Sequence, residues 1–135
     1  MGRDNVRDAR ELAMKMVFQM DANNDYDHRN VTLNEMTERY KNNNRAIEIL
    51  EAIKLHKEDI DILIEANSKT RKIERIAKTD LAILRVAICE IMYIDDVPDA
   101  VAINEAVELV KKYGSDNANK YINALLGSVV RNKQI

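Results

Sequence analysis

Hydrophobic residues recur at spacings of three and four positions along most of the 135-residue chain. This period places side chains on one face of an α-helix, whereas a half-buried strand would alternate apolar and polar residues. The pattern predicts helices over about residues 3–20, 45–66, 100–113 and 117–131, a short helix up to about 77, and a longer one from about 79 to the turn at 95–100. We therefore expect a chain that is helical nearly throughout.

Polar segments mark where the predicted helices end. Residues 21–30, "DANNDYDHRN", are almost entirely polar and predict a surface loop. The polar run "NSKTRK", which follows the second long helix, predicts a seam in a single domain, with subdomains of about 1–67 and 68–135.

Several capping signals accompany these boundaries. "TLNE" is a capping box in which Thr32 and Glu35 satisfy each other's backbone N–H groups, so it predicts a short helix to about residue 40. Gly114 stands where a left-handed C-terminal cap is expected, and Asp116 is expected to cap the last helix at its N-terminus.

The composition excludes several classes of protein. Three glycines and one proline are too few turn formers for a sheet protein, so we predict an all-α fold of six or seven helices, arranged as two small bundles that share one core. The same scarcity excludes a glycine-rich phosphate loop. The single cysteine, Cys89, lies in the apolar run "AICEIM" and is expected in the core. The chain shows neither a signal peptide nor a membrane-length apolar run, so we expect a cytoplasmic protein.

Candidate catalytic and metal-binding residues are few. His28 lies in the polar loop and His56 on a charged helix face, and neither has a cysteine or second histidine at ligand spacing, so we expect both to be solvated and no metal to bind. The carboxylate pairs Asp95–Asp96 and Asp59–Asp61 are interpreted as a helix end and a solvated face. We expect neither catalytic residues nor a cofactor.

The charge distribution is more informative than the net charge of −2. The first 20 and the last 28 residues together carry nine basic and five acidic side chains, while the middle of the chain is acidic. If the two ends lie side by side, their lysines and arginines would form one patch able to neutralise several phosphates.

One side of the first predicted helix combines cations with the only phenylalanine of the chain. The row consists of Arg3, Arg7, Arg10, Met14 and Phe18. Such a row suits single-stranded RNA, because guanidinium groups meet phosphates and an aromatic ring stacks on an unpaired base. The competing interpretation is an ordinary solvated face. Asp4 and Asp8 lie among the arginines, Arg7 can pair with Glu11 four residues on, and Phe18 can be a core residue.

Four stretches resemble the NusB family of bacterial transcription antitermination factors. They are "RDARELAMKMVFQMD", "IAKTDLAILRVAICEI", "DVPDAVAINEAVELVKKYG" and "NKYINALLGSVVR". The resemblance implies two three-helix bundles packed roughly perpendicular to each other, without catalytic activity. It also implies two ligands: the ribosomal protein NusE, and boxA, a short single-stranded element in leader transcripts of ribosomal RNA operons. In the family this assembly joins RNA polymerase and other Nus factors.

The resemblance also implies site residues by position. For RNA binding these are Arg7, Arg10 and Phe18 on the first helix, with Arg3 preceding them in the same row, and a second group of Tyr113, Asn117, Lys120 and Tyr121. Asp80 matches an acidic position that faces the ribosomal protein. Many family members have adjacent arginines in the first turn, whereas Val6 and Asp8 flank Arg7 here, so we expect RNA binding to depend on the partner.

Two other interpretations remain open at this level. NusB-like domains also precede the catalytic domain of certain ribosomal RNA methyltransferases, but this sequence has no glycine-rich methyl-donor site or catalytic cysteine motif. The chain can also be a helical scaffold or a homodimer without an RNA role. The segment "AINEA", which contains Asn104 and Glu105, is interpreted as structural.

Overall fold

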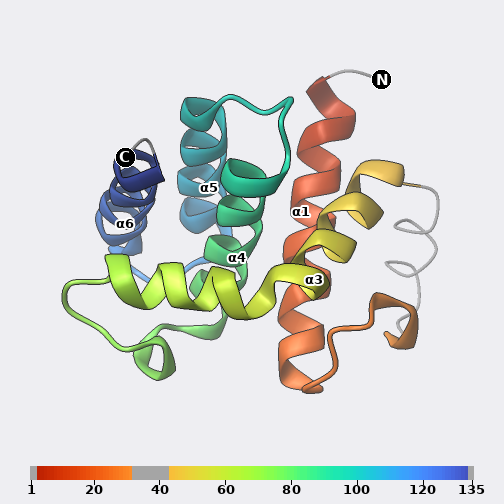
Figure 1. Ribbon diagram of the computed structural model, residues 1–135, viewed down its shortest axis with the longest axis horizontal. Coiled ribbons are helices and arrows are strands. Elements are labelled where there is room, and N and C mark those ends of the chain that lie inside the picture. Colours follow the sequence, from red (N-terminus) through yellow and green to blue (C-terminus); the bar gives the residue numbers. More distant parts are fainter. Residues whose placement is uncertain (1–2, 32–42, 134–135) are drawn as a thin grey trace.

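The computed structural model describes residues 3–31 and 43–133, with side chains from Val6 onward (Figure 1). Its elements are α1 (Arg3–Ala22), the 3₁₀ helix η1 (His28–Asn30), α3 (Asn44–Asn67), the 3₁₀ helix η2 (Ile73–Arg75), α4 (Lys78–Tyr93), α5 (Asp99–Tyr113) and α6 (Ala118–Lys133). No strand occurs in these two segments, so the predicted all-α class is confirmed. The capping box at Thr32 and the short helix predicted after it lie outside the described residues.

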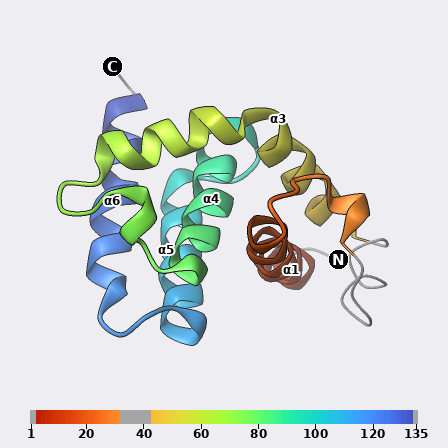
Figure 2. The same cartoon turned by 90° about the horizontal axis from the view of Figure 1, so that it is seen from below.

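Helix α4 occupies the centre of the molecule, and α1, α3, α5 and α6 all pack against it. Figure 2 shows α3 and α5 on opposite sides of α4, with α1 and α6 on the two remaining sides. The sequence of α4 explains this position, because apolar residues cover its whole circumference and every residue from Asp80 to Ile91 is buried. Within the described residues, no helix combines the length and the apolar character needed to cross a membrane.

Three ionisable residues of α4 are buried together with its apolar ones: Asp80, Arg85 and Glu90. A buried charge is tolerated only where other groups pair with it. Glu90 receives two hydrogen bonds from Arg10 of α1, at 2.7 and 2.9 Å, and Arg85 donates to both carboxylate oxygens of Asp61 on α3, at 2.9 and 3.1 Å. These pairs fix α1 and α3 in register against α4.

The helix boundaries agree with the sequence pattern to within a few residues, and capping explains where some of them fall. Helix α3 begins after Asn43, whose side-chain oxygen accepts a hydrogen bond from the N–H of Ala46 at 3.0 Å. The same helix is bent at His56, whose backbone is not helical (φ −113°, ψ 15°). The helix predicted to end at about residue 77 is the 3₁₀ helix η2.

Two capping predictions are wrong. Gly114 is not left-handed, because its φ is −81° and its ψ is 179°. Glycine is needed there for a different reason: a Cβ atom would stand only 2.6 Å from Oδ1 of Asp80 and 2.8 Å from the carbonyl oxygen of Val110. The residue directly before α6 is Asn117 rather than Asp116, and Asn117 adopts a left-handed conformation with φ of 63°. Asparagine tolerates this conformation better than most residues.

We expect the substitution Glu90→Ala to lower the free energy of unfolding by about 3–5 kcal/mol, because it leaves the buried Arg10 guanidinium without its main partner. Urea denaturation measures this loss. The matched control is Glu108→Ala, which removes a carboxylate that is 63% exposed and pairs only with Lys111; its cost should stay below about 1 kcal/mol. Equal losses in the two variants would contradict a structural role for the Arg10–Glu90 pair.

Candidate nucleic-acid interface

The outer side of α1 lies beside α5, and together the two helices form one charged surface. We call it the α1–α5 face and define it by Arg7, Glu11, Lys15, Phe18, Glu105, Glu108, Lys111, Lys112 and Tyr113. The α1 members follow one another at spacings of four, four and three residues, so they share one side of that helix. Four of the nine residues are basic, three are acidic and two are aromatic.

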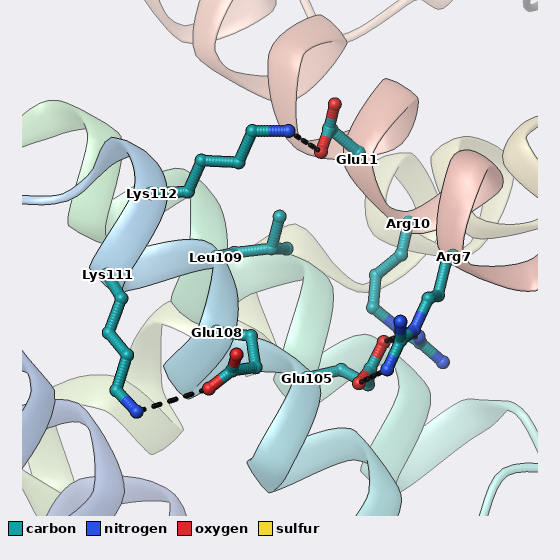
Figure 3. Close-up of a pocket in the computed structure, with 8 residues that line it drawn as sticks. All are labelled: Arg7, Arg10, Glu11, Glu105, Glu108, Leu109, Lys111 and Lys112. Carbon is teal, nitrogen blue, oxygen red and sulfur yellow. Dashed lines mark hydrogen bonds and ion pairs between the residues drawn. The ribbon is translucent and has the colours of Figure 1, made fainter.

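A groove of about 380 Å³ separates the two helices on this face (Figure 3). It is lined by Arg7, Arg10, Glu11, Glu105, Glu108, Leu109, Lys111 and Lys112. Ion pairs bridge it at both ends. Glu105 accepts hydrogen bonds from Arg7 at 2.9 and 3.1 Å, and Glu11 accepts one from Lys112 at 3.2 Å. The arginine–glutamate pair predicted within α1 is therefore replaced by pairs between helices.

The two predicted RNA-binding arginines differ in exposure. The Arg7 side chain is 67% exposed and lies at the rim of the groove. The Arg10 side chain is buried, where it pairs with Glu90 and also donates to Glu105 at 3.2 Å. The three-residue step from Arg7 turns the Arg10 side chain toward α4, so in this structure Arg10 is a buried ion-pair residue beside the exposed Arg7. Glu105, which the sequence analysis interprets as structural, accepts hydrogen bonds from the guanidinium groups of both Arg7 and Arg10.

Glu11 organises the middle of the α1–α5 face. Its carboxylate accepts hydrogen bonds from the Tyr113 hydroxyl at 3.0 Å and from Lys112, and Lys15 lies 3.7 Å away. Partial burial raises the pKa of Glu11, but the hydrogen bonds from Tyr113 and Lys112 outweigh that effect and hold the pKa below its usual value. The ionised Glu11 carboxylate therefore positions the ammonium groups of Lys15 and Lys112 and the ring of Tyr113.

Aromatic rings and cations meet in a second hollow, of about 320 Å³, at the other end of the face. It is lined by Met14, Lys15, Phe18, Gln19, Thr79 and Tyr113. Phe18 is 40% exposed, so it is neither the core residue of one interpretation nor fully solvated. The ammonium groups of Lys15 and Lys112 both stand 5.1 Å from the centre of the Tyr113 ring. This arrangement offers apolar ring surface with positive charge beside it.

The second predicted group of RNA-binding residues is only partly brought together. Tyr113 belongs to the α1–α5 face. Tyr121 on α6 shares a hydrogen bond with the Ser68 hydroxyl at 2.7 Å, and the Arg71 guanidinium lies 4.7 Å from its ring centre. Asn117 and Lys120 are exposed between these two sites, in the turn after α5 and the first turn of α6. Arg3 begins α1, and the structure does not describe its side chain.

Asp80, predicted to face a protein partner, is fully buried in this structure. Its carboxylate accepts hydrogen bonds from the Ser115 N–H at 3.1 Å and from the Ser115 hydroxyl at 2.6 Å. It therefore ties the turn between α5 and α6 to the start of α4. The turn after α5 folds over Asp80 in this structure, which the missing side chain of Gly114 permits.

Both histidines differ from their predicted solvated state. His28 is buried, and its Nε2 atom lies 2.8 Å from Oε1 of Glu51. His56 stacks on Tyr93 with ring centres 3.7 Å apart. Within residues 3–31 and 43–133, no three histidine, cysteine, aspartate or glutamate side chains gather as a metal ion would require. Cys89 is buried as expected, and burial raises the pKa of its thiol to about 12.

Comparison with known proteins identifies the family. The sequence profile of the NusB family matches residues 7–131. The chain is 42% identical over 133 residues to the transcription antitermination protein NusB of Finegoldia magna, with 95% of each chain covered. It is 44% identical over 137 residues to the protein of the same name from Acetivibrio thermocellus, with 98% of this chain and 91% of that one covered. The chain belongs to the NusB family.

Solved structures support the NusB fold. A crystal form of NusB from T. maritima superposes with a TM-score of 0.78 at 27% identity, covering 93% of this chain and 90% of that one. A structure of antitermination factors NusB and NusE in complex with double-stranded RNA superposes with a TM-score of 0.75 at 21% identity, covering 98% and 99%. At this identity the second likeness concerns the fold of the NusB family alone.

The lowered pKa of Glu11 predicts a pH-dependent contribution to stability. A carboxylate whose pKa is lower in the folded chain than in the unfolded one stabilises the fold above the unfolded pKa, and this contribution disappears as the pH falls through the folded pKa. We expect Glu11→Gln to lower the free energy of unfolding at pH 7, and the difference from the parent protein to shrink below about pH 4.5. Urea denaturation at a series of pH values tests this expectation. A difference in the free energy of unfolding between the two proteins that stays constant down to the lowest pH of the series would contradict it.

Proposed function

We propose that this member of the NusB family is a non-catalytic transcription antitermination factor. It binds single-stranded RNA of the boxA type together with the ribosomal protein NusE, and so supports transcription of ribosomal RNA operons by RNA polymerase and other Nus factors. The observation that carries the proposal is the α1–α5 face, where Lys15 and Lys112 stand over the Tyr113 ring beside the exposed Phe18, and Arg7 and Lys111 line the adjoining groove. The names of the relatives, transcription antitermination protein NusB, agree with it.

The chemistry of the face suits a single strand better than a duplex. An unpaired base can stack on the exposed ring of Phe18, and such stacking contributes about 1–3 kcal/mol per base. Lys15 and Lys112 stand beside the neighbouring Tyr113 ring, and Arg7 and Lys111 line the groove, where the phosphates of an extended strand would pass. A rigid duplex hides its base faces and could use only the cations.

The roles within the face divide between contact and positioning. Arg7 and Phe18 are proposed to contact RNA, as predicted from the sequence, and Lys15 and Lys112 join them. Arg10 is proposed to act as a positioning residue, because it holds Glu105, which in turn orients Arg7. Asn117, Lys120 and Tyr121 are proposed as a second contact site farther along the strand.

Acidic residues within the face account for the expected dependence on the protein partner. Glu105 and Glu11 already neutralise Arg7 and Lys112, so RNA phosphates compete with them for the same cations. The attraction of the isolated chain for RNA is correspondingly reduced. NusE, bound at the same time, would complete the site.

Replacing Arg7 by alanine should weaken binding of a fluorescent boxA RNA and flatten its dependence on salt by about 0.7 in the logarithmic slope, the effect of one phosphate contact to a single strand. Fluorescence anisotropy at several salt concentrations measures both quantities, with and without NusE. Arg29→Ala is the matched control, because Arg29 is similarly exposed, also forms an ion pair with a carboxylate, that of Asp27, and lies on η1. An unchanged slope for Arg7→Ala, or an equal change for Arg29→Ala, would remove Arg7 from the site.

The substitution Phe18→Ala should reduce RNA affinity by roughly fivefold or more, because one stacked base is lost. Unlike Arg7→Ala, it should leave the salt slope unchanged, since no charge is removed. Circular dichroism melting should show that the variant still folds. If affinity is retained while the melting temperature falls, Phe18 is a packing residue and not a base platform.

A further inference from the structure

The outer side of α3 exposes two large apolar side chains that no other part of the described structure covers. Leu55 is 78% exposed and Ile62 is 63% exposed, the two highest values among the large hydrophobic residues described. They stand on either side of the bend at His56, and each is exposed while Ile53 and Ile60 are buried, so both point away from the core. Ala66, also exposed, continues the row by one further turn. Apolar side chains aligned in this way are typical of an interaction surface.

Acidic residues surround this apolar row. The exposed charged positions of α3 are Glu48, Glu51, Lys54, Glu58, Asp59 and Glu65, five acids against one base. The one lysine is itself drawn toward the carboxylate of Asp27, at 3.6 Å. The face is thus strongly negative, whereas the α1–α5 face carries an excess of basic residues. Nucleic acid would be repelled from it, and a positively charged protein segment would be attracted.

The surface of α3 is concave beside Leu55, where a hollow lies. It has a volume of about 650 Å³ and is lined by Glu51, Ala52, Lys54, Leu55, His56 and Tyr93. His56 and Tyr93 are stacked almost parallel, with 5° between their planes, at the point where α3 bends. An arginine or lysine side chain can lie over such a ring pair while it pairs with a neighbouring carboxylate.

We propose that the outer face of α3 is a second docking surface, and that it takes a basic, amphipathic helical segment of a protein partner. Apolar residues of that segment would cover Leu55 and Ile62. Its lysines or arginines would pair with Glu58 and Asp59, and one of them would enter the hollow beside Tyr93. A helix laid on such a row is a recurrent mode of peptide recognition.

The position of this surface allows it to act together with the α1–α5 face. Figure 2 shows α4 lying between α3 and α5, so the two surfaces belong to different sides of the molecule. The residues that line the groove of Figure 3 are not among those that line the hollow on α3. The inference does not depend on the proposed RNA function, since it uses residues of α3 and α4 only.

The test uses the full chain labelled with nitrogen-15 and a synthetic helical peptide of leucine and lysine, with leucines placed at a helical period. We expect amide shift changes to cluster at residues 51–66 and near Tyr93. The double variant Glu58→Lys/Asp59→Lys should weaken binding at least about tenfold, and Ile62→Ser should weaken it severalfold. Because all three side chains are exposed, the variants should fold, which their amide spectra will show.

Matched controls separate docking from general attraction between charges. A scrambled peptide of the same composition keeps the charge but loses the apolar face, and Glu74→Lys removes an exposed carboxylate on η2 instead of α3. Val101→Ser is the control for loss of an exposed apolar residue, on α5. Equal binding of the scrambled peptide, or equal losses in the control variants, would overturn the proposal. Sedimentation of the chain alone as a dimer that Ile62→Ser dissociates would also overturn it, because the occupant would be a second copy.

Discussion

The burial of charged groups within α4 is the constraint on which the rest of the structure depends. A helix surrounded on all sides by other helices leaves its ionisable side chains no access to water, so each must find its partner on a neighbouring helix. Arg10 of α1 and Asp61 of α3 meet this requirement for Glu90 and Arg85, and the turn after α5 meets it for Asp80. The apolar contacts of α4 permit many orientations of its neighbours, whereas these directional pairs select one.

Glu105 connects one of these buried ion pairs to the surface of the molecule. Arg10 donates two hydrogen bonds to Glu90, and its other amino group donates one to Glu105, which also accepts from the exposed Arg7. A side chain at the rim of the groove is thus connected to the central helix α4 through three ion pairs, Arg7–Glu105, Glu105–Arg10 and Arg10–Glu90. Such a connection fixes where the positive charge of Arg7 stands, which a flexible surface arginine would not do. The cost is that part of its charge is already neutralised.

The sequence pattern predicted the fold well because helical periodicity and the scarcity of glycine and proline are local signals. The helix positions, the burial of Cys89 and the exposure of Arg7 all follow from them. The pattern could not show that Arg10 turns inward, because this depends on a glutamate eighty residues away. For the same reason it could include Lys15 and Lys112 in a basic patch only by assuming that the two ends of the chain are adjacent, and it assigned Glu11 to a pair with Arg7 instead of to Lys112 and Tyr113 of α5. Gly114 was expected for its backbone freedom, but its small size is what the turn requires, since Asp80 fills the neighbouring space.

The central position of α4 also bears on how the chain opens. Amide hydrogens exchange with solvent only when their helix separates from its neighbours, and regions that open independently exchange at their own rates. Helix α4 contacts all four other described α-helices, so it cannot be exposed unless the whole assembly comes apart. We therefore expect the chain on the two sides of the predicted division near residue 67 to unfold together. The amides of α4 should exchange last and together, at the rate of global unfolding, and report the stability of the entire chain.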